Sequence, residues 1–228
     1  MNQQSKTLNK DIKRLCGMAM FVALAVVATL LTKWLRVAHL TFDAKDAIIT
    51  IAAYIYGPLP SLAMSLATAM IESLTFGGDT GWYGFLMNFF STAAFSFTAS
   101  IIYTKKRDIN GALIGLLSAT VVTTGVMLLL NMFIAPFYFG LPLFAPYIME
   151  MIPTLILPFN FAKALMNSAI AMYLYKPVLA ALREAKLIDG GSKKSLSFNR
   201  NSLIIIITGA VVMIVSVAIF VILMKLRT

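Results

Sequence analysis

Long apolar segments limit the possible folds of this chain more than any other feature. Seven of them follow one another, separated by polar stretches, and several approach 20 residues. A helix of about 20 apolar residues crosses the hydrocarbon core of a bilayer, whereas a transmembrane barrel needs short strands of alternating polarity. The sequence therefore predicts an all-α integral membrane protein. The expected helices span residues 15–35, 44–56, 61–76, 82–103, 112–138, 152–175 and 203–226.

The composition supports this class and suggests an orientation. The chain is 60% hydrophobic and only 12% charged, whereas soluble domains are about half apolar and a quarter charged. A net charge of +10 would suggest a nucleic-acid partner for a soluble protein, but these basic residues lie beside apolar segments. The positive-inside rule explains them, and we expect no nucleic acid. With a cytoplasmic N-terminus, the loops on the inner side carry 13 of the 19 lysines and arginines.

The sequence offers little for catalysis or for a metal. Cys16 is the only cysteine and His39 the only histidine, which excludes a disulfide within the chain and metal sites built from several of these residues. No phosphate-binding glycine-rich loop, zinc motif or serine-hydrolase motif occurs. We expect neither an enzyme nor an intrinsic cofactor. Energy for uphill transport would come from a partner or an ion gradient.

One charge inside an apolar segment points to function. Lys163 lies within 152–175, where an ammonium costs a few kcal/mol or more unless it meets a partner or a wet cavity. Asn160 and Asn167 share its helical face, and together these groups offer donors and acceptors to the edge of a planar heterocycle. The alternative is that Lys163 pairs with Glu72 or Glu150 and only stabilises the bundle.

Further candidates lie in the next two helices. Asn88 and Asn131 are amides within apolar segments, and each either contacts a ligand or forms a hydrogen bond between helices. Trp82 and Tyr83 begin the segment 82–103, where aromatic residues usually belong to an interfacial belt.

The polar loop 39–46 could close over a cavity that opens outward. The alternative is a surface loop in which Asp43 caps the following helix. Ala19 and Ala23 form a weaker pattern in the first helix, because small residues four apart allow another helix to approach closely.

These motifs, in this order, resemble the substrate-binding S components of energy-coupling factor (ECF) transporters, most closely the riboflavin-specific RibU type. The resemblance covers about residues 15–175. The residues that carry it are Ala19 and Ala23, 40–46 (LTFDAKD), 57–58 (GP), 81–89 (GWYGFLMNF) and 158–163 (PFNFAK).

The resemblance implies a six-helix bundle with an outward-facing pocket sealed by the first loop. Riboflavin would be the bound substrate, with Asn160 and Lys163 hydrogen-bonding the polar edge of its ring. Ala19 and Ala23 would contact the transmembrane coupling subunit (EcfT type), which carries two cytoplasmic ATPases. The other substrate-binding residues expected are Thr41, Phe42, Trp82, Tyr83, Asn88, Asn131 and Asn167.

With the resemblance, the chain divides into four parts in a bacterial plasma membrane. Residues 1–14 form a basic cytoplasmic segment, 15–178 the six-helix substrate-binding domain, 179–202 a basic linker and 203–226 an extra transmembrane helix. This last helix departs from the family pattern, and the sequence assigns it no role.

Other functions stay open at this point. The chain could be an S component for another flat heterocyclic vitamin. It could be a membrane enzyme that uses Lys163, Glu72 and Glu150 for acid–base chemistry, or a structural subunit in which Lys163 belongs to an internal ion pair.

Overall fold

The computed structural model describes residues 3–37, 40–75, 81–184 and 200–225, which are mostly helical. The elements in chain order are α1 (Gln3–Thr32), β1 (Arg36–Val37), β2 (Leu40–Thr41), α2 (Lys45–Tyr56), α3 (Pro58–Thr75), α4 (Gly81–Lys105), α5 (Ile109–Phe139), α6 (Pro146–Met151), the π-helical turn η1 (Ile152–Ile156), α7 (Leu157–Glu184) and α8 (Arg200–Lys225). Since α6, η1 and α7 run on without a loop, they form one long sixth helix. The predicted fold class, six helices plus a C-terminal seventh, is confirmed.

Some helix ends differ from the expected ones. α1 begins at Gln3, so the basic residues before the first apolar segment continue its helix. α7 passes the expected end at Tyr175 and reaches Glu184. Both ends of the expected linker 179–202 are therefore helical, while its centre lies outside the described residues, as does His39.

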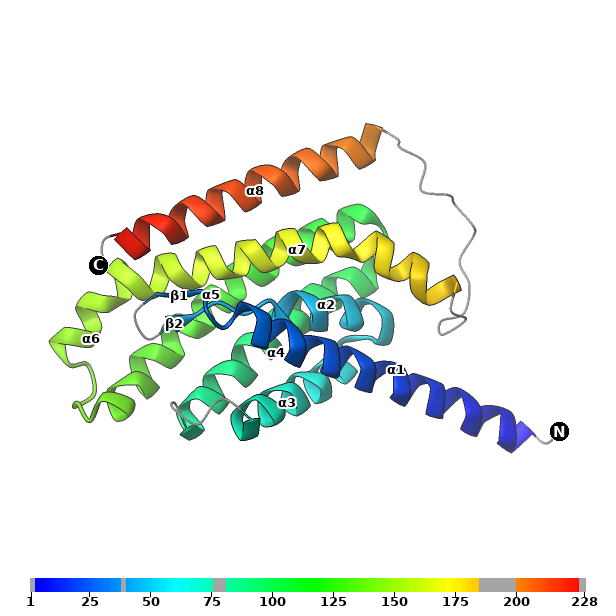
Figure 1. The fold of residues 1–228 in the computed structure, drawn as a ribbon, viewed down its shortest axis with the longest axis horizontal. Helices are drawn as coiled ribbons and strands as arrows, with labels where there is room; N and C mark the ends of the chain where they lie inside the picture. The colour runs from blue at the N-terminus through cyan, green and yellow to red at the C-terminus, as the bar shows by residue number, and fades with distance from the viewer. Residues whose placement is uncertain (1–2, 38–39, 76–80, 185–199, 226–228) are drawn as a thin grey trace.

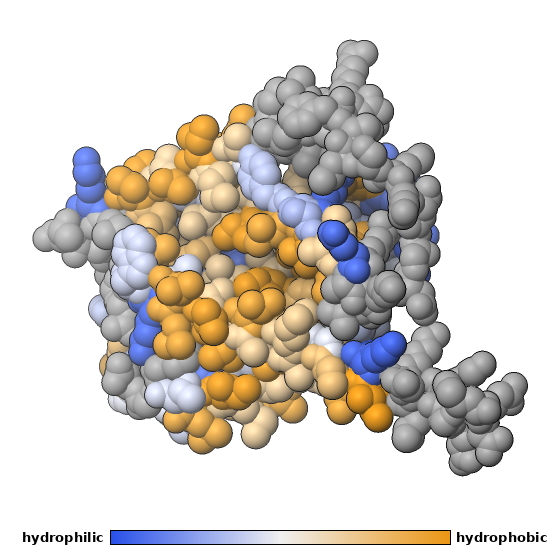
Figure 2. All heavy atoms as spheres, turned by 45° about the vertical axis from the view of Figure 1, so that its right-hand side comes forward, coloured by the Kyte–Doolittle hydropathy of each residue, from blue (hydrophilic) through white to orange (hydrophobic). Residues whose placement is uncertain are grey.

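The surface suits a bilayer. Four helical stretches are long and apolar enough to cross one: Asp11–Thr32, Gly81–Lys105, Ile109–Phe139 and Pro146–Leu182. Figure 2 shows hydrophobic side chains over most of the coloured surface in that view, with hydrophilic ones mainly towards its two sides. The chain is a multi-pass membrane protein.

α2 is short and lies at the centre of the bundle. Its 12 residues span about 18 Å, well below the thickness of a hydrocarbon core. It packs against α1, α3, α4 and α7, and three quarters of its residues are buried. Gly57 follows with φ of 99°, a conformation that favours glycine, and Pro58 then begins α3. The first residues of α2 therefore lie inside the protein rather than in water.

A small hairpin connects α1 to α2. β1 and β2 pair antiparallel, with Arg36 opposite Thr41 and Val37 opposite Leu40. The backbone N–H of Phe42 donates to the carbonyl of Leu35 at 2.8 Å, which extends the pairing by one step. We call residues 35–37 and 40–43 the first loop.

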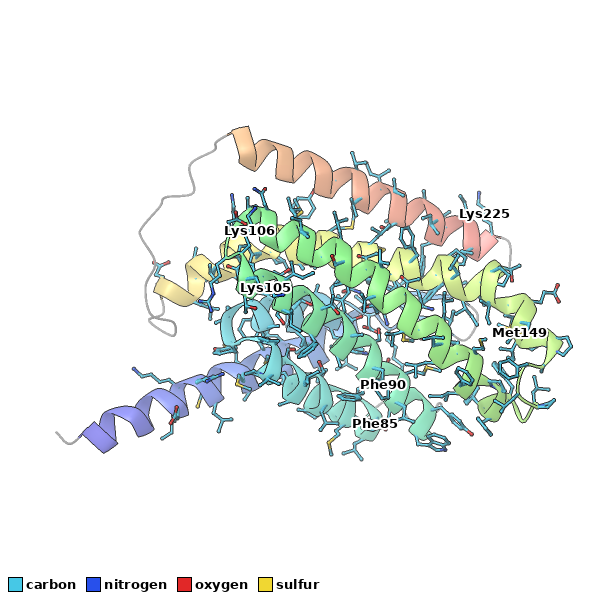
Figure 3. All side chains as sticks on the ribbon, turned by 180° about the vertical axis from the view of Figure 1, so that it is seen from behind. Phe85, Phe90, Lys105, Lys106, Met149 and Lys225 are labelled. Carbon is cyan, nitrogen blue, oxygen red and sulfur yellow. The ribbon has the colours of Figure 1, made fainter. Side chains whose placement is uncertain are left out.

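Different residues lie at the two ends of the bundle. Figure 3 shows Lys105 and Lys106, at the end of α4, on the opposite end of the molecule from Met149 and Lys225. Figure 1 shows α8 along one side of the bundle, next to α7, with α1 on the other side. The first loop lies at the end of the bundle that is remote from Lys105 and Lys106.

Close packing of α4 and α5 leads to a stability prediction. A Cβ at Gly115 would lie 2.7 Å from the carbonyl oxygen of Ala99, so Gly115→Ala forces two backbones apart. We expect a loss of about 1–3 kcal/mol and a lower melting temperature in detergent. Gly125→Ala on the same helix is the control, because a Cβ there meets nothing within 4 Å. A Gly115→Ala protein as stable as the control would contradict this packing.

Candidate functional site: a buried charge cluster beside a cavity

Five ionisable side chains meet at the first turn of α2. Lys163 of α7 donates to Asp43 Oδ2 at 3.0 Å, and Lys45 lies 3.2 Å from the same oxygen. Lys45 also donates to Glu72 Oε2 at 2.7 Å, while Asp46 Oδ2 lies 4.0 Å from Lys163. Lys45 is fully buried, with 0% of its surface exposed. We call these five residues the charge cluster.

Neutral polar groups complete the charge cluster. Thr92 of α4 donates to Asp46 Oδ1 at 2.6 Å, and Ser91 donates to Oδ2 at 3.3 Å. Asn88, one turn before Thr92, donates to Glu72 Oε1 at 2.8 Å. Buried charges are tolerated in low-dielectric surroundings only when they are paired and hydrogen-bonded, and this network meets both conditions.

Asn167 caps α2 from another helix. Its Oδ1 accepts from the backbone N–H of Ala47, in the first turn of α2, at 3.1 Å. Its Nδ2 donates to the carbonyl of Asp43 at 3.0 Å and to that of Lys163 at 3.1 Å. The expectation that Asp43 caps the helix is wrong: the N-cap residue is Ala44, which has no side-chain cap, and Asp43 is buried among lysines. Asn167 thus satisfies helix-end groups that water would otherwise hydrate.

Opposite charges set the protonation of Asp43 in the first loop. Burial alone would raise the pKa of its carboxyl. The ammonium groups of Lys163 and Lys45 outweigh that effect and lower this pKa below the ordinary value. Asp43 is therefore an anion that bridges two lysines.

A cavity of about 160 Å³ opens beside the charge cluster. Its wall comes from the end of α1, the first loop, α3, the start of α4, the end of α5 and the start of α7. The lining residues are Thr29, Lys33, Leu40, Thr41, Asp43, Glu72, Tyr83, Gly84, Met87, Asn88, Met127, Asn131, Ile134, Ala135, Tyr138, Phe139, Phe159, Asn160 and Lys163. The cavity thus has a charged end and a largely apolar wall, as expected for a small-molecule site.

Six of the nine residues expected to bind a substrate line this cavity: Thr41, Tyr83, Asn88, Asn131, Asn160 and Lys163. Three do not. Asn167 is fully buried behind it, and Phe42 is buried in an apolar cluster. Trp82 is 59% exposed and stacks on Tyr83 with ring centroids 3.8 Å apart.

Lys163 has a partner that the sequence did not indicate. Neither expected carboxylate is its main partner, because Glu150 is exposed and Glu72 bonds to Lys45 and Asn88. The partner is Asp43, 120 residues earlier in the chain. Lys163 is therefore both part of an internal ion pair and part of the cavity wall.

The sequence motifs did not single out Asp43 and Lys45 as site residues. Lys45 is enclosed by Asp43 and Glu72. One signal was present: two acids and a lysine directly precede an apolar segment too short to cross a membrane. Such charges need partners inside the protein.

Asn131 and Asn160 offer amide groups to the cavity. Each donates from Nδ2 to a carbonyl in its own helix, to Met127 at 2.7 Å and to Ile156 at 2.8 Å. Across the part of the chain that the structure describes, these are their hydrogen bonds, so each retains an oxygen and a second N–H. Asp43 also lines the cavity, and its Oδ1 has no hydrogen-bond partner within the described ranges.

Comparison with known proteins identifies the family of this chain. The family model of the substrate-specific component of ECF transporters matches residues 13–175. The chain belongs to this family. It is 31% identical over 182 residues to the riboflavin transporter RibU of Staphylococcus aureus (strain TCH60), which covers 77% of this chain and 95% of the relative.

A solved structure agrees with the family. The S component of a bacterial ECF transporter superposes with a TM-score of 0.65 at 29% identity, over 76% of this chain and 99% of that one. The matched range 13–175 contains the charge cluster and every cavity-lining residue, and it ends before α8.

The charge cluster predicts a large stability effect of Lys45. In Lys45→Met, the carboxylates of Asp43 and Glu72 stay buried but lose the ammonium that pairs with them. We expect the free energy of unfolding to fall by about 3–5 kcal/mol. Lys106→Met is the matched control: its side chain is 58% exposed, 3.8 Å from Asp108, and contributes about 0–1 kcal/mol. Thermal unfolding of the ligand-free protein in detergent measures both. Equal melting temperatures would show that the cluster does not stabilise the fold.

Proposed function

We propose that this S component captures riboflavin outside the cell and delivers it inward. Support for the substrate comes from the relative named a riboflavin transporter, at 31% identity. The observation in this chain that carries the proposal is the polar end of the cavity, which is lined by Lys163 and by the amides of Asn131 and Asn160. A flat ring edge with carbonyl and imide groups needs donors and acceptors of this kind.

The remaining cavity wall suits the rest of a flavin. The amides of Asn131 and Asn160 can bond further ring or chain atoms, while Tyr83, Met87 and Phe159 provide apolar surface for a planar ring. The same residues would bind rather than transform their ligand, in keeping with a family of substrate-specific components. We therefore propose no catalytic role.

The positions of Lys105 and Lys106 support a direction of capture. Lys105 and Lys106 lie at the end of the bundle remote from the first loop and the cavity. If that basic end faces the cytoplasm, the N-terminus is cytoplasmic and the cavity opens to the outside of a bacterial plasma membrane.

Uptake against a gradient requires an energy source, which family membership suggests is an ECF module. In the proposed assembly, a transmembrane coupling subunit of the EcfT type joins the S component to two cytoplasmic ATPases. Ala19 and Ala23 support a contact on α1, because both are exposed and share one face.

A substitution in the cavity tests the substrate. Asn131→Leu removes one side-chain amide. In the described part of the chain, the only hydrogen bond of this amide is to a carbonyl of its own helix, so the fold should persist. We expect riboflavin affinity to fall about tenfold to a hundredfold, since a buried donor or acceptor on the ligand is left unpaired. Quenching of riboflavin fluorescence by purified protein measures the affinity. Asn110→Leu, at the exposed start of the same helix, is the control.

The same titration distinguishes the alternatives. Thiamine and biotin serve as comparison ligands for the unmodified protein. Tight binding of one of them without riboflavin would identify an S component for another vitamin, and no binding of any would contradict the proposal.

Substitutions on α1 test the proposed contact with the coupling subunit. Ala19→Trp or Ala23→Trp places a large ring where close approach of another helix is proposed. We expect normal riboflavin binding by the solitary subunit but loss of uptake in cells that contain the ECF module. Val211→Trp, on an exposed face of α8, is the control and should leave uptake intact. Loss of binding in the alanine variants would place these residues inside the bundle instead.

A further inference from the structure

α8 lies beyond the residues that match the family, yet it reaches the site. Its C-terminal half packs on α7 and contacts β1. Phe220 and Leu223 are buried in an apolar cluster with Val37, Phe42 and Phe159, and the rings of Phe220 and Phe159 lie 6.0 Å apart. These five residues join α8, the first loop and the start of α7 in one contact.

Two residues of this cluster directly precede polar residues that line the cavity. Phe42 directly precedes Asp43, and Phe159, which itself lines the cavity, directly precedes Asn160. A shift of either ring would therefore move a polar group at the charged end of the cavity. Phe220 packs against the ring of Phe159 and belongs to the same cluster as Phe42, so it would act on the polar groups through these two phenylalanines.

The first loop needs such support. Its strands have two residues each, and a hairpin of this size is not stable by itself. The polar side of the loop is held by the Lys163–Asp43 ion pair, and its apolar side by the cluster that contains Phe220 and Leu223. Figure 1 shows the C-terminal end of α8 at the same end of the bundle as β1 and β2.

We propose that α8 is a clamp on the first loop, and that Phe220 and Leu223 are positioning residues that hold this loop over the cavity. The clamp slows opening of the loop, and with it the exchange of ligand. The part of this inference that concerns ligand exchange rests on the proposed function, whereas the part that concerns the loop does not.

Hydrogen–deuterium exchange of the ligand-free full-length protein tests the clamp directly. In Phe220→Ala we expect the backbone amides of residues 35–37 and 40–43 to exchange roughly five- to tenfold faster, because a buried ring contact is lost. Ile222→Ala, with a side chain 56% exposed on the same helix, is the control and should exchange as the unmodified protein does. Phe220→Leu keeps an apolar side chain at this position, so its first loop should exchange almost as slowly as in the unmodified protein. Leu223→Ala is a second variant for the case in which Phe220→Ala does not fold.

The amides at the centre of α5 serve as an internal reference for the whole bundle. Unchanged exchange in the first loop of both folded variants would overturn the proposal. Faster exchange in α5 as well as in the loop would also overturn it, because α8 would then contribute general stability only.

Riboflavin dissociation completes the test. We expect release from Phe220→Ala to be faster by a similar factor, with little change for Ile222→Ala. An unmodified protein that binds no riboflavin would contradict the proposed function, while the exchange measurement would still decide on the clamp. Binding by the unmodified protein with equal release rates in both variants would contradict the clamp alone.

Discussion

The ion pair between Asp43 and Lys163, extended by Lys45, is the interaction on which the structure depends. α2 is too short to bring its first turn to a membrane surface, so the charges there must be satisfied within the protein. Asp43 Oδ2 lies within hydrogen-bond distance of both lysines, at 3.0 and 3.2 Å. Since removing either partner leaves a charge buried, the cluster selects one arrangement of the loop, α2 and α7.

The same cluster joins the stability of the bundle to the binding of its ligand. Glu72 brings α3, Asn88 brings α4 and Asn167 brings α7 to the start of α2. Several of these groups also face the cavity, so a ligand that bonds to Lys163 or Asp43 acts on the contacts that place the helices. This is a physical route by which an occupied cavity can differ in shape or stability from an empty one.

Hydropathy predicted the long helices well, because length and apolar content suffice to identify α4 and α5. The amides and Lys163 were also recognised, since a polar group in an apolar segment is visible in sequence. Their partners were not. Lys163 and Asp43 are 120 residues apart, and the sequence does not indicate which of several carboxylates a buried lysine will meet. The alternative in which Asp43 caps α2 is based on the frequency of Asp at helix starts. In the structure the side chain of Asn167 takes that place: its Oδ1 accepts from the backbone N–H of Ala47, and its Nδ2 donates to the carbonyl of Asp43.

Phe42 belongs to a sequence motif expected to bind the substrate, but its side chain does not line the cavity. Leu40, Thr41 and Asp43 line the cavity, while Phe42 faces the apolar cluster that contains Phe220. A shift by one residue would bring a phenyl ring to the lysines and a carboxylate to the apolar cluster, and both changes are unfavourable. The loop is therefore placed by two environments at once, charged on one side and apolar on the other. In this chain the apolar side is built in part by α8, so a helix outside the family range helps to fix the register of the loop.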